Sequence, residues 1–184
     1  AAGADTAYAD AAKVAPSDAE VFWLWGKFLV DSASDAVKRE EGRRHLQKSL
    51  SLNPTHAPSH VQLGVEHQKD GQYDQAVQHF ARAIQADPTH TTARVQEVIV
   101  LALSNKCKKA TRKARDILPT PKLGEKLLGG LAYVFETCGE NALWKTTLAR
   151  AMEESPEGVM QLGEKRSYLF KYATALVKEQ RYLE

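Results

Sequence analysis

The chain has 184 residues, of which 43% are hydrophobic and 26% are charged, and its formal net charge is +2. This composition excludes a disordered chain, and the near-balance of charge gives no indication of a nucleic-acid or membrane partner. The longest apolar run, Val98–Leu103, is far shorter than the roughly 18 residues of a membrane span.

Prolines occur at a regular interval along the chain. The interval from Pro88 to Pro156 is twice the interval from Pro54 to Pro88. The interval from Pro16 to Pro54 is longer than this shorter spacing by about one helical turn. A fixed period in the range of roughly 20–50 residues is typical of stacked structural repeats. The prolines therefore predict a repeat array.

The segment 58–86 predicts one pair of helices. Pro58 fits the first turn of a helix, where its missing N–H costs nothing, and "HVQLGVEHQK" continues that helix. Gly71 in "DGQYD" can adopt the left-handed conformation that ends a helix. Ala76, Phe80 and Ala83 then follow at spacings of four and three, which places them on one face of a second helix.

This segment, extended to Pro88, resembles a tetratricopeptide repeat. The residues in register with the signature of that family are Leu63, Gly64, Tyr73, Ala76, Phe80, Ala83 and Pro88. His60 and His67 stand where the family prefers large aromatic residues. The resemblance implies an all-α fold, a right-handed superhelical solenoid of antiparallel helix pairs.

Carried along the chain, the register predicts one array over residues 1–184. We expect the end of a preceding repeat at 1–18, a repeat with an insertion at 19–56, the best-matching repeat at 57–90, a degenerate repeat at 91–124, a repeat at 125–156, and a linker with the first helix of a following repeat at 157–184. The insertion in "DSASDAVKREEG" predicts a longer loop or an extra helical turn. Because both ends match internal parts of a repeat, we expect a fragment of a longer protein.

No sequence motif predicts catalysis or a cofactor. A phosphate-binding loop, a dinucleotide fingerprint, HExxH and GxSxG are all absent from the sequence. His56 and His60 have a spacing that can chelate a metal, but Pro58 intervenes and no third ligand has suitable spacing, so we expect no metal site. Cys107 and Cys138 form no CxxC pair and no disulfide framework. They predict ordinary thiols in a reducing compartment, hence an intracellular, cytoplasmic protein. Redox sensing is the alternative, and its only local support is the lysines beside Cys107.

In the tetratricopeptide repeat family the first helix of each pair lines a concave groove, and the resemblance carries that role onto specific residues here. The predicted lining is Trp23, Lys27, Val30, Val61, Gln62, Val65, Val95, Gln96, Ile99, Tyr133, Phe170 and Lys171. Because this set is mainly apolar, we expect a non-catalytic scaffold or adaptor that binds a hydrophobic or amphipathic segment, or a neighbouring subunit. For Val95 and Ile99, packing against a neighbouring repeat is the alternative.

One kind of protein partner is not expected. Family members that clamp the acidic C-terminal tails of chaperones use lysines, asparagines and an arginine on these inner faces. Only Lys27 carries charge in the first part of the predicted groove. We therefore do not expect a chaperone tail as the ligand.

A basic stretch offers a different function. Residues 106–126 hold eight basic and two acidic residues. The candidate basic patch is Lys106, Lys108, Lys109, Arg112, Lys113 and Arg115. The patch predicts a site that binds nucleic acid or an anionic surface. The alternative is a helix face that is only solvated. Because no aromatic residues are interleaved with the basic ones, nucleic-acid binding is weakly supported. Self-association through the open array ends, giving a homo-oligomer, is a third alternative.

Overall fold

The computed structural model describes residues 2–154, which form nine helices and no strand. The predicted fold class, an all-α array of helix pairs, is confirmed. The chain divides into two compact units, Ala1–Ala93 and Arg94–Glu184. No helix in the part of the chain that the structure describes is long and apolar enough to span a membrane.

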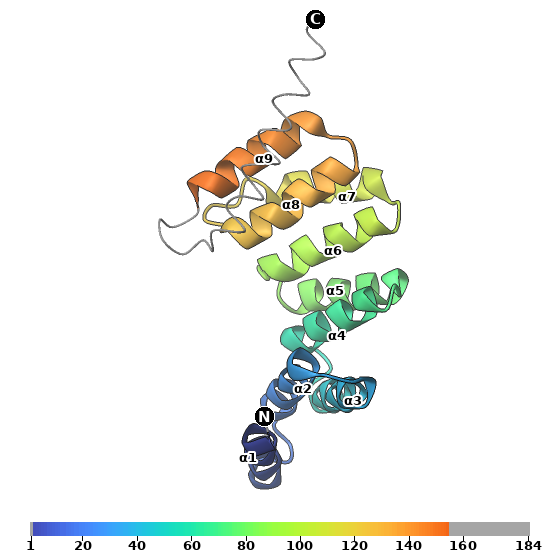
Figure 1. The fold of residues 1–184 in the computed structure, drawn as a ribbon, viewed down its shortest axis with the longest axis vertical. Coiled ribbons are helices and arrows are strands. Elements are labelled where there is room, and N and C mark those ends of the chain that lie inside the picture. The colour runs from blue at the N-terminus through green and yellow to red at the C-terminus, as the bar shows by residue number, and fades with distance from the viewer. Residues whose placement is uncertain (1, 155–184) are drawn as a thin grey trace, which may run out of the picture. The chain divides into compact units, whose positions relative to one another are not determined.

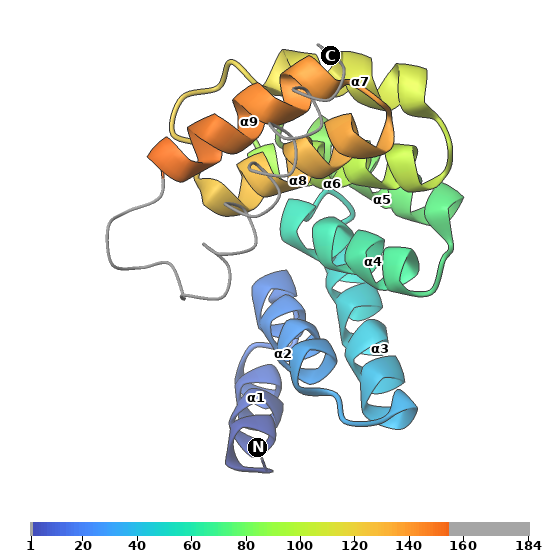
Figure 2. The same cartoon turned by 45° about the horizontal axis from the view of Figure 1, so that its top comes forward.

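The first unit holds five helices, drawn from blue to green in Figure 1. They are α1 (Ala2–Val14), α2 (Ala19–Ser32), α3 (Ala36–Leu52), α4 (Ala57–Lys69) and α5 (Tyr73–Ala86). Helices α2 and α3 form one antiparallel pair and α4 and α5 the next, as Figure 2 also shows. Asp18 and Asp35 cap α2 and α3, since each carboxylate accepts a hydrogen bond from a backbone N–H in the first turn.

The insertion predicted in the first full repeat lies within a helix. Helix α3 has 17 residues, whereas α5, the second helix of the next pair, has 14. The connection between α2 and α3 is confined to residues 33–35. Of the two readings of "DSASDAVKREEG", the structure therefore has the extra helical turn.

Glycines let the paired helices of the first unit approach closely. A Cβ atom added at Gly26 would lie 2.7 Å from the carbonyl oxygen of Gly42, and one at Gly64 would lie 2.7 Å from the Phe80 ring. Leu46 is fully buried at the contact between α2 and α3. Gly71 has a φ of 73°, which is the left-handed conformation predicted for it.

The second unit holds the remaining described helices, α6 (Thr91–Leu103, which begins just before the unit boundary), α7 (Cys107–Ile117), α8 (Glu125–Thr137) and α9 (Asn141–Glu153). Helices α8 and α9 form an antiparallel pair, and α7 packs against α8. Phe135 and Leu148 are buried in this unit. Gly130 on α8 admits Val95 and Ile99 of α6, whose side-chain carbons would lie 3.0 Å from an added Cβ.

Candidate functional site

A pocket of about 420 Å³ lies between α1 and α2 in the first unit. Its apolar lining consists of Tyr8 from α1 and Trp23, Leu24 and Phe28 from α2. The Tyr8 and Phe28 rings pack with centroids 5.5 Å apart, and Leu24 is 38% exposed. Trp23 is half-buried and packs against the core residues Val30, Leu46 and Leu63. The pocket thus has an aromatic wall supported by the core and an accessible aliphatic side chain.

Polar side chains form the rest of this pocket. Lys27 Nζ lies 2.5 Å from Asp31 Oδ2, one turn further along α2, and both side chains are about half exposed. Gln62 of α4 donates a hydrogen bond from its amide to Asp31 Oδ1, at 3.4 Å. The two pairs place an ammonium, a carboxylate and an amide beside the aromatic wall, where they could orient a bound chain.

The structure brings together part of the predicted groove in the first unit. Trp23 and Lys27 line the pocket and Gln62 contacts it through Asp31, whereas Val61 packs on the small core of Ala57, Ala83 and Ala93. Val65 is half-buried on α4.

The prediction for Val30 was wrong. Its side chain is 4% exposed, because it packs with Leu46 and Leu63.

Three pocket residues were missed by the sequence reasoning. Leu24 and Phe28 lie four residues apart on α2, and this spacing is a signal for a shared face that could have found them. Tyr8 had no such signal, because its position depends on the packing of α1 against α2.

The predicted groove residues of the second unit are placed differently. Val95 is 1% exposed and, with Ile99, faces Gly130 of α8, so both fill a helix contact. This is the packing alternative that the sequence left open. Tyr133 is 38% exposed and Gln96 is half-buried. Phe170 and Lys171 lie outside the described residues.

The structure divides the basic patch into paired and exposed cations. Lys113 Nζ donates to both carboxylate oxygens of Glu97, each at 2.6 Å, and Arg115 donates to Glu140 at 2.8 Å. Glu97 is only 4% exposed, so Lys113 neutralises a buried carboxylate. The exposed side chains of the patch without an ion pair, within residues 2–154, are Lys108, Lys109 and Arg112. Lys106 is the N-cap residue of α7.

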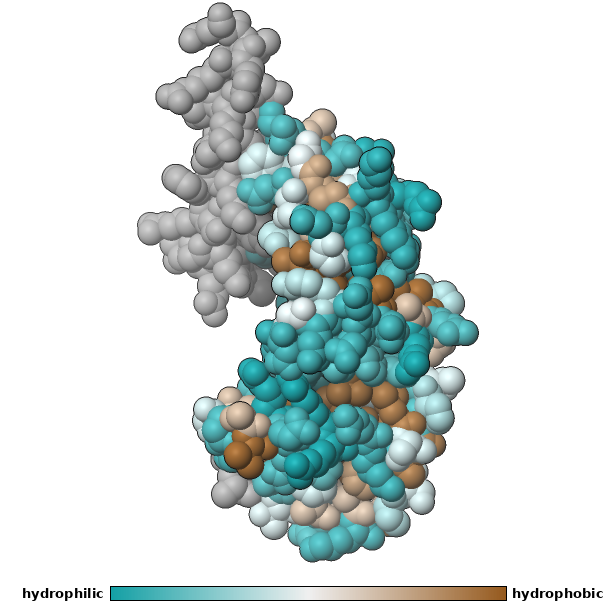
Figure 3. All heavy atoms as spheres, turned by 90° about the vertical axis from the view of Figure 1, so that its right-hand side faces the viewer, coloured by the Kyte–Doolittle hydropathy of each residue, from teal (hydrophilic) through white to brown (hydrophobic). Residues whose placement is uncertain are grey.

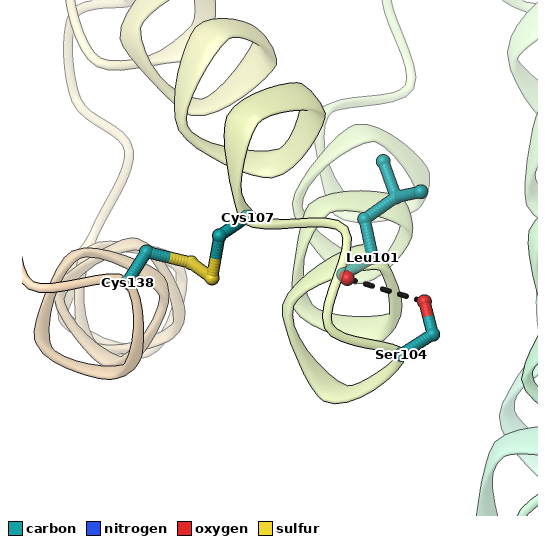
Figure 4. Close-up of a disulfide and its surroundings, with 4 residues drawn as sticks. All are labelled: Leu101, Ser104, Cys107 and Cys138. Carbon is teal, nitrogen blue, oxygen red and sulfur yellow. Dashed lines mark hydrogen bonds between the residues drawn. A yellow bond between two sulfur atoms is a disulfide. The ribbon is translucent and has the colours of Figure 1, made fainter.

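The prediction of free thiols was wrong. Cys107 and Cys138 form a disulfide with a Cα–Cα distance of 5.4 Å, which joins the start of α7 to the end of α8 (Figure 4). Sequence spacing did not reveal the bridge because the cysteines are separated by 31 residues and meet only when α7 packs against α8.

Three histidines of α4 and α5 gather on the first unit. His60 is 2% exposed, its Nε2 donates to the Pro54 carbonyl oxygen at 3.1 Å, and its Nδ1 lies 3.0 Å from Nδ1 of His79. The His67 ring stacks on His79 with centroids 5.2 Å apart. Among the residues described, no group of three potential ligands is arranged to hold a metal ion.

The histidine contact accepts only one proton easily. Because a carbonyl oxygen can only accept, Nε2 of neutral His60 carries the hydrogen, so its Nδ1 accepts one from His79. Protonating both rings would set two N–H groups against each other. Burial, followed by the neighbouring charges of His60, His67 and Arg82, lowers the pKa of His79 to about 4. Burial also lowers the pKa of His60 and of His45.

This pKa shift predicts that the first unit loses stability in acid. In the unfolded chain His79 takes up a proton near pH 6.5, but in the folded chain it does so only near pH 4. The unfolded state therefore binds more protons between these values, and stability falls as the pH falls through that window. We expect a loss of about 1–2 kcal/mol after allowing for the partial exposure of the ring. Urea unfolding at a series of pH values measures it.

A His79→Phe variant provides the control for the acid effect. In this variant the free energy of unfolding should fall less steeply between pH 6.5 and pH 4. The dependence on pH that remains should come from His45 and His60. An unchanged slope in His79→Phe would contradict the assignment.

Comparison with known proteins gives one family match and many structural ones. Residues 57–90 match the tetratricopeptide repeat model, which confirms the resemblance found there. No curated protein matches the sequence. A crystal structure of MamA is 20% identical, with a TM-score of 0.66 over 83% of this chain and 86% of that one.

Two further structures are similar. A tetratricopeptide repeat protein from Parabacteroides merdae is 16% identical, with a TM-score of 0.66 over 84% of this chain and 59% of that one. TTC0263, a thermophilic protein of the same repeat class from Thermus thermophilus, is 19% identical, with a TM-score of 0.64 over 95% and 89% of the two chains. At these identities the likeness shows the fold.

Proposed function

We propose that this chain is a non-catalytic scaffold or adaptor. It contains a tetratricopeptide repeat at residues 57–90 within an all-α solenoid of that fold. Its partner is a protein that offers a hydrophobic or amphipathic segment. The aromatic pocket between α1 and α2 is the observation that carries the proposal, since it lies on a helix predicted from the repeat register to contact a partner.

The size and lining of the pocket favour one large apolar side chain as the anchor. A volume of about 420 Å³ accommodates such a side chain, and Tyr8, Trp23 and Phe28 would contact one side of it. Most of the affinity should come from this anchor, because a few buried aromatic contacts dominate protein interfaces. Lys27, Asp31 and Gln62 would fix the direction of the bound chain through polar contacts.

Figure 3 shows one face of the molecule, on which hydrophilic side chains dominate and apolar ones lie in separate patches. Asp31 beside Lys27 also opposes a strongly acidic ligand, in line with the absence of a carboxylate clamp from the sequence.

A peptide library displayed on phage tests this proposal with two matched variants. Leu24→Asp places a charge in the pocket wall, and Val37→Asp places one on α3 at a side chain that is 77% exposed and outside the pocket. Selected peptides should share a large apolar residue. They should bind wild type and Val37→Asp equally, and Leu24→Asp about tenfold or more weakly, because one desolvated anchor contributes more than about 1.4 kcal/mol. Equal binding by both variants would show that the pocket is not the site.

Binding of nucleic acid or an anionic surface through the basic patch remains the alternative function, with fewer residues than the sequence predicted. Only Lys108, Lys109 and Arg112 of the described patch would present unpaired charge to nucleic acid or an anionic surface. Binding through them should weaken steeply as salt rises, whereas binding in the aromatic pocket should depend little on salt. Self-association through array ends would appear as a concentration-dependent mass.

The argument for an intracellular, cytoplasmic placement does not hold. It was based on the expectation of free thiols, and the disulfide removes that argument because disulfides persist mainly in oxidising compartments.

A further inference from the structure

The disulfide between α7 and α8 is accessible from a second pocket. This pocket has a volume of about 390 Å³, and both cysteines line it. Each cysteine is only partly buried, so its sulfur is not sealed in the core of the second unit. A small molecule that enters the pocket therefore contacts both cysteines.

Positive charge surrounds the bridge. Lys108, Arg112 and Arg115 line the same pocket, together with the carboxylates of Asp116 and Glu140. Arg115 and Glu140 neutralise each other at 2.8 Å. Lys108 and Arg112 are exposed, and neither has an ion pair in the described part of the chain. The pocket thus has a surplus of one positive charge, which favours an anionic molecule.

The two sulfurs differ in their surroundings. Cys107 is the first residue of an 11-residue helix, and the helix N-terminus together with Lys108 stabilises negative charge on its sulfur. Cys138 directly follows the C-terminus of α8, where the helix dipole has the opposite sign, and Glu140 lies two residues on. Cys107 is therefore the better leaving group in an exchange reaction.

We propose that the Cys107–Cys138 disulfide is an exchange site for a small anionic thiol. The thiolate of that molecule attacks Sγ of Cys138, the bond between the two cysteines breaks, and its electron pair leaves on Sγ of Cys107. The products are a mixed disulfide on Cys138 and a thiolate on Cys107. A second molecule of the thiol then attacks the mixed disulfide, which releases the oxidised dimer of the small thiol and leaves both cysteines reduced, with protons taken from water.

The experiment compares thiols of different charge on the intact chain. Reduced glutathione is the anionic probe, and cysteamine is the cationic one, each at the same thiolate concentration. Opening of the bridge is followed by alkylation and mass spectrometry under native conditions. We expect glutathione to open it about threefold to tenfold faster than cysteamine, and this ratio to fall toward one in high salt. The trapped intermediate should carry the glutathione on Cys138.

Charge variants show whether the preference for glutathione comes from the cations beside the disulfide or from the charge of the whole protein. A Lys108→Gln/Arg112→Gln variant should lose the preference for glutathione. The matched Lys38→Gln/Arg44→Gln variant removes two exposed cations of α3 and should keep it. Equal rates for the two thiols, glutathione trapped on Cys107, or opening only at the rate of global unfolding would each overturn the proposal. The last result would make the bridge a structural link only.

Discussion

Replacing Lys113 by methionine is expected to lower the free energy of unfolding by about 1–2 kcal/mol, although Lys113 was predicted as part of a binding surface. The loss is smaller than for a fully buried pair because the Lys113 side chain is 35% exposed. Its ammonium donates to both carboxylate oxygens of Glu97, at 2.6 Å, and the Glu97 side chain is 5% exposed. Methionine would keep most of the apolar contacts of lysine but leave the carboxylate without its partner in the interior. Urea unfolding followed by circular dichroism measures the loss.

Two variants test the physical reason for this loss. Lys108→Met removes an exposed lysine of the same helix and should change stability by less than about 0.5 kcal/mol. Glu97→Gln combined with Lys113→Met should recover part of the stability, since an amide costs less to bury than an unpaired charge. If Lys113→Met were as stable as Lys108→Met, the ion pair would contribute nothing.

Replacing Gly26 by alanine should destabilise the first unit by about 2–3 kcal/mol. The new Cβ would lie 2.7 Å from the carbonyl oxygen of Gly42 and 2.9 Å from the backbone nitrogen of Leu46. Two of the three nearest atoms are backbone, so a side-chain rotation cannot relieve the clash and α2 must move away from α3. Equilibrium unfolding in urea again gives the magnitude.

Gly3→Ala is the matched control for that change. Gly3 also lies in a helix, but nothing lies within 4 Å of an added Cβ. The substitution should leave stability unchanged or raise it by up to about 1 kcal/mol, because alanine favours a helix more than glycine does. A Gly26→Ala protein as stable as Gly3→Ala would mean that the helices are less closely packed than the structure has them.

The helix pair of the repeat could be predicted from the sequence because the residues that indicate it act locally. Pro58, Gly71 and the spacing of Ala76, Phe80 and Ala83 each act within one or two helical turns. Helix bounds and the inward faces follow from such short-range rules. The structure therefore has α4 and α5 where the residues alone placed them.

The candidate binding surface could be predicted only in part, because the exposure of its side chains depends on contacts between helices. Trp23 and Lys27 were found from the repeat register, but the register did not distinguish a side chain in a pocket from one buried in a helix contact. Val95 illustrates this limit, since its side chain packs closely against α8 where Gly130 has no side chain. Lys113 illustrates it too, because its role depends on a carboxylate 16 residues away.

The bridge from α7 to α8 also changes how far unfolding can spread. In stacked repeats each helix pair contacts only its neighbours, so one pair can unfold locally while the rest of the array stays folded. Here a covalent bond that spans 31 residues joins the pair α8–α9 to the helix before it. It limits how far a frayed α8 can separate from α7, which shortens the search for refolding. With the disulfide formed, α7, α8 and α9 should unfold as one cooperative block. With the disulfide reduced, α7 and the pair α8–α9 should unfold separately.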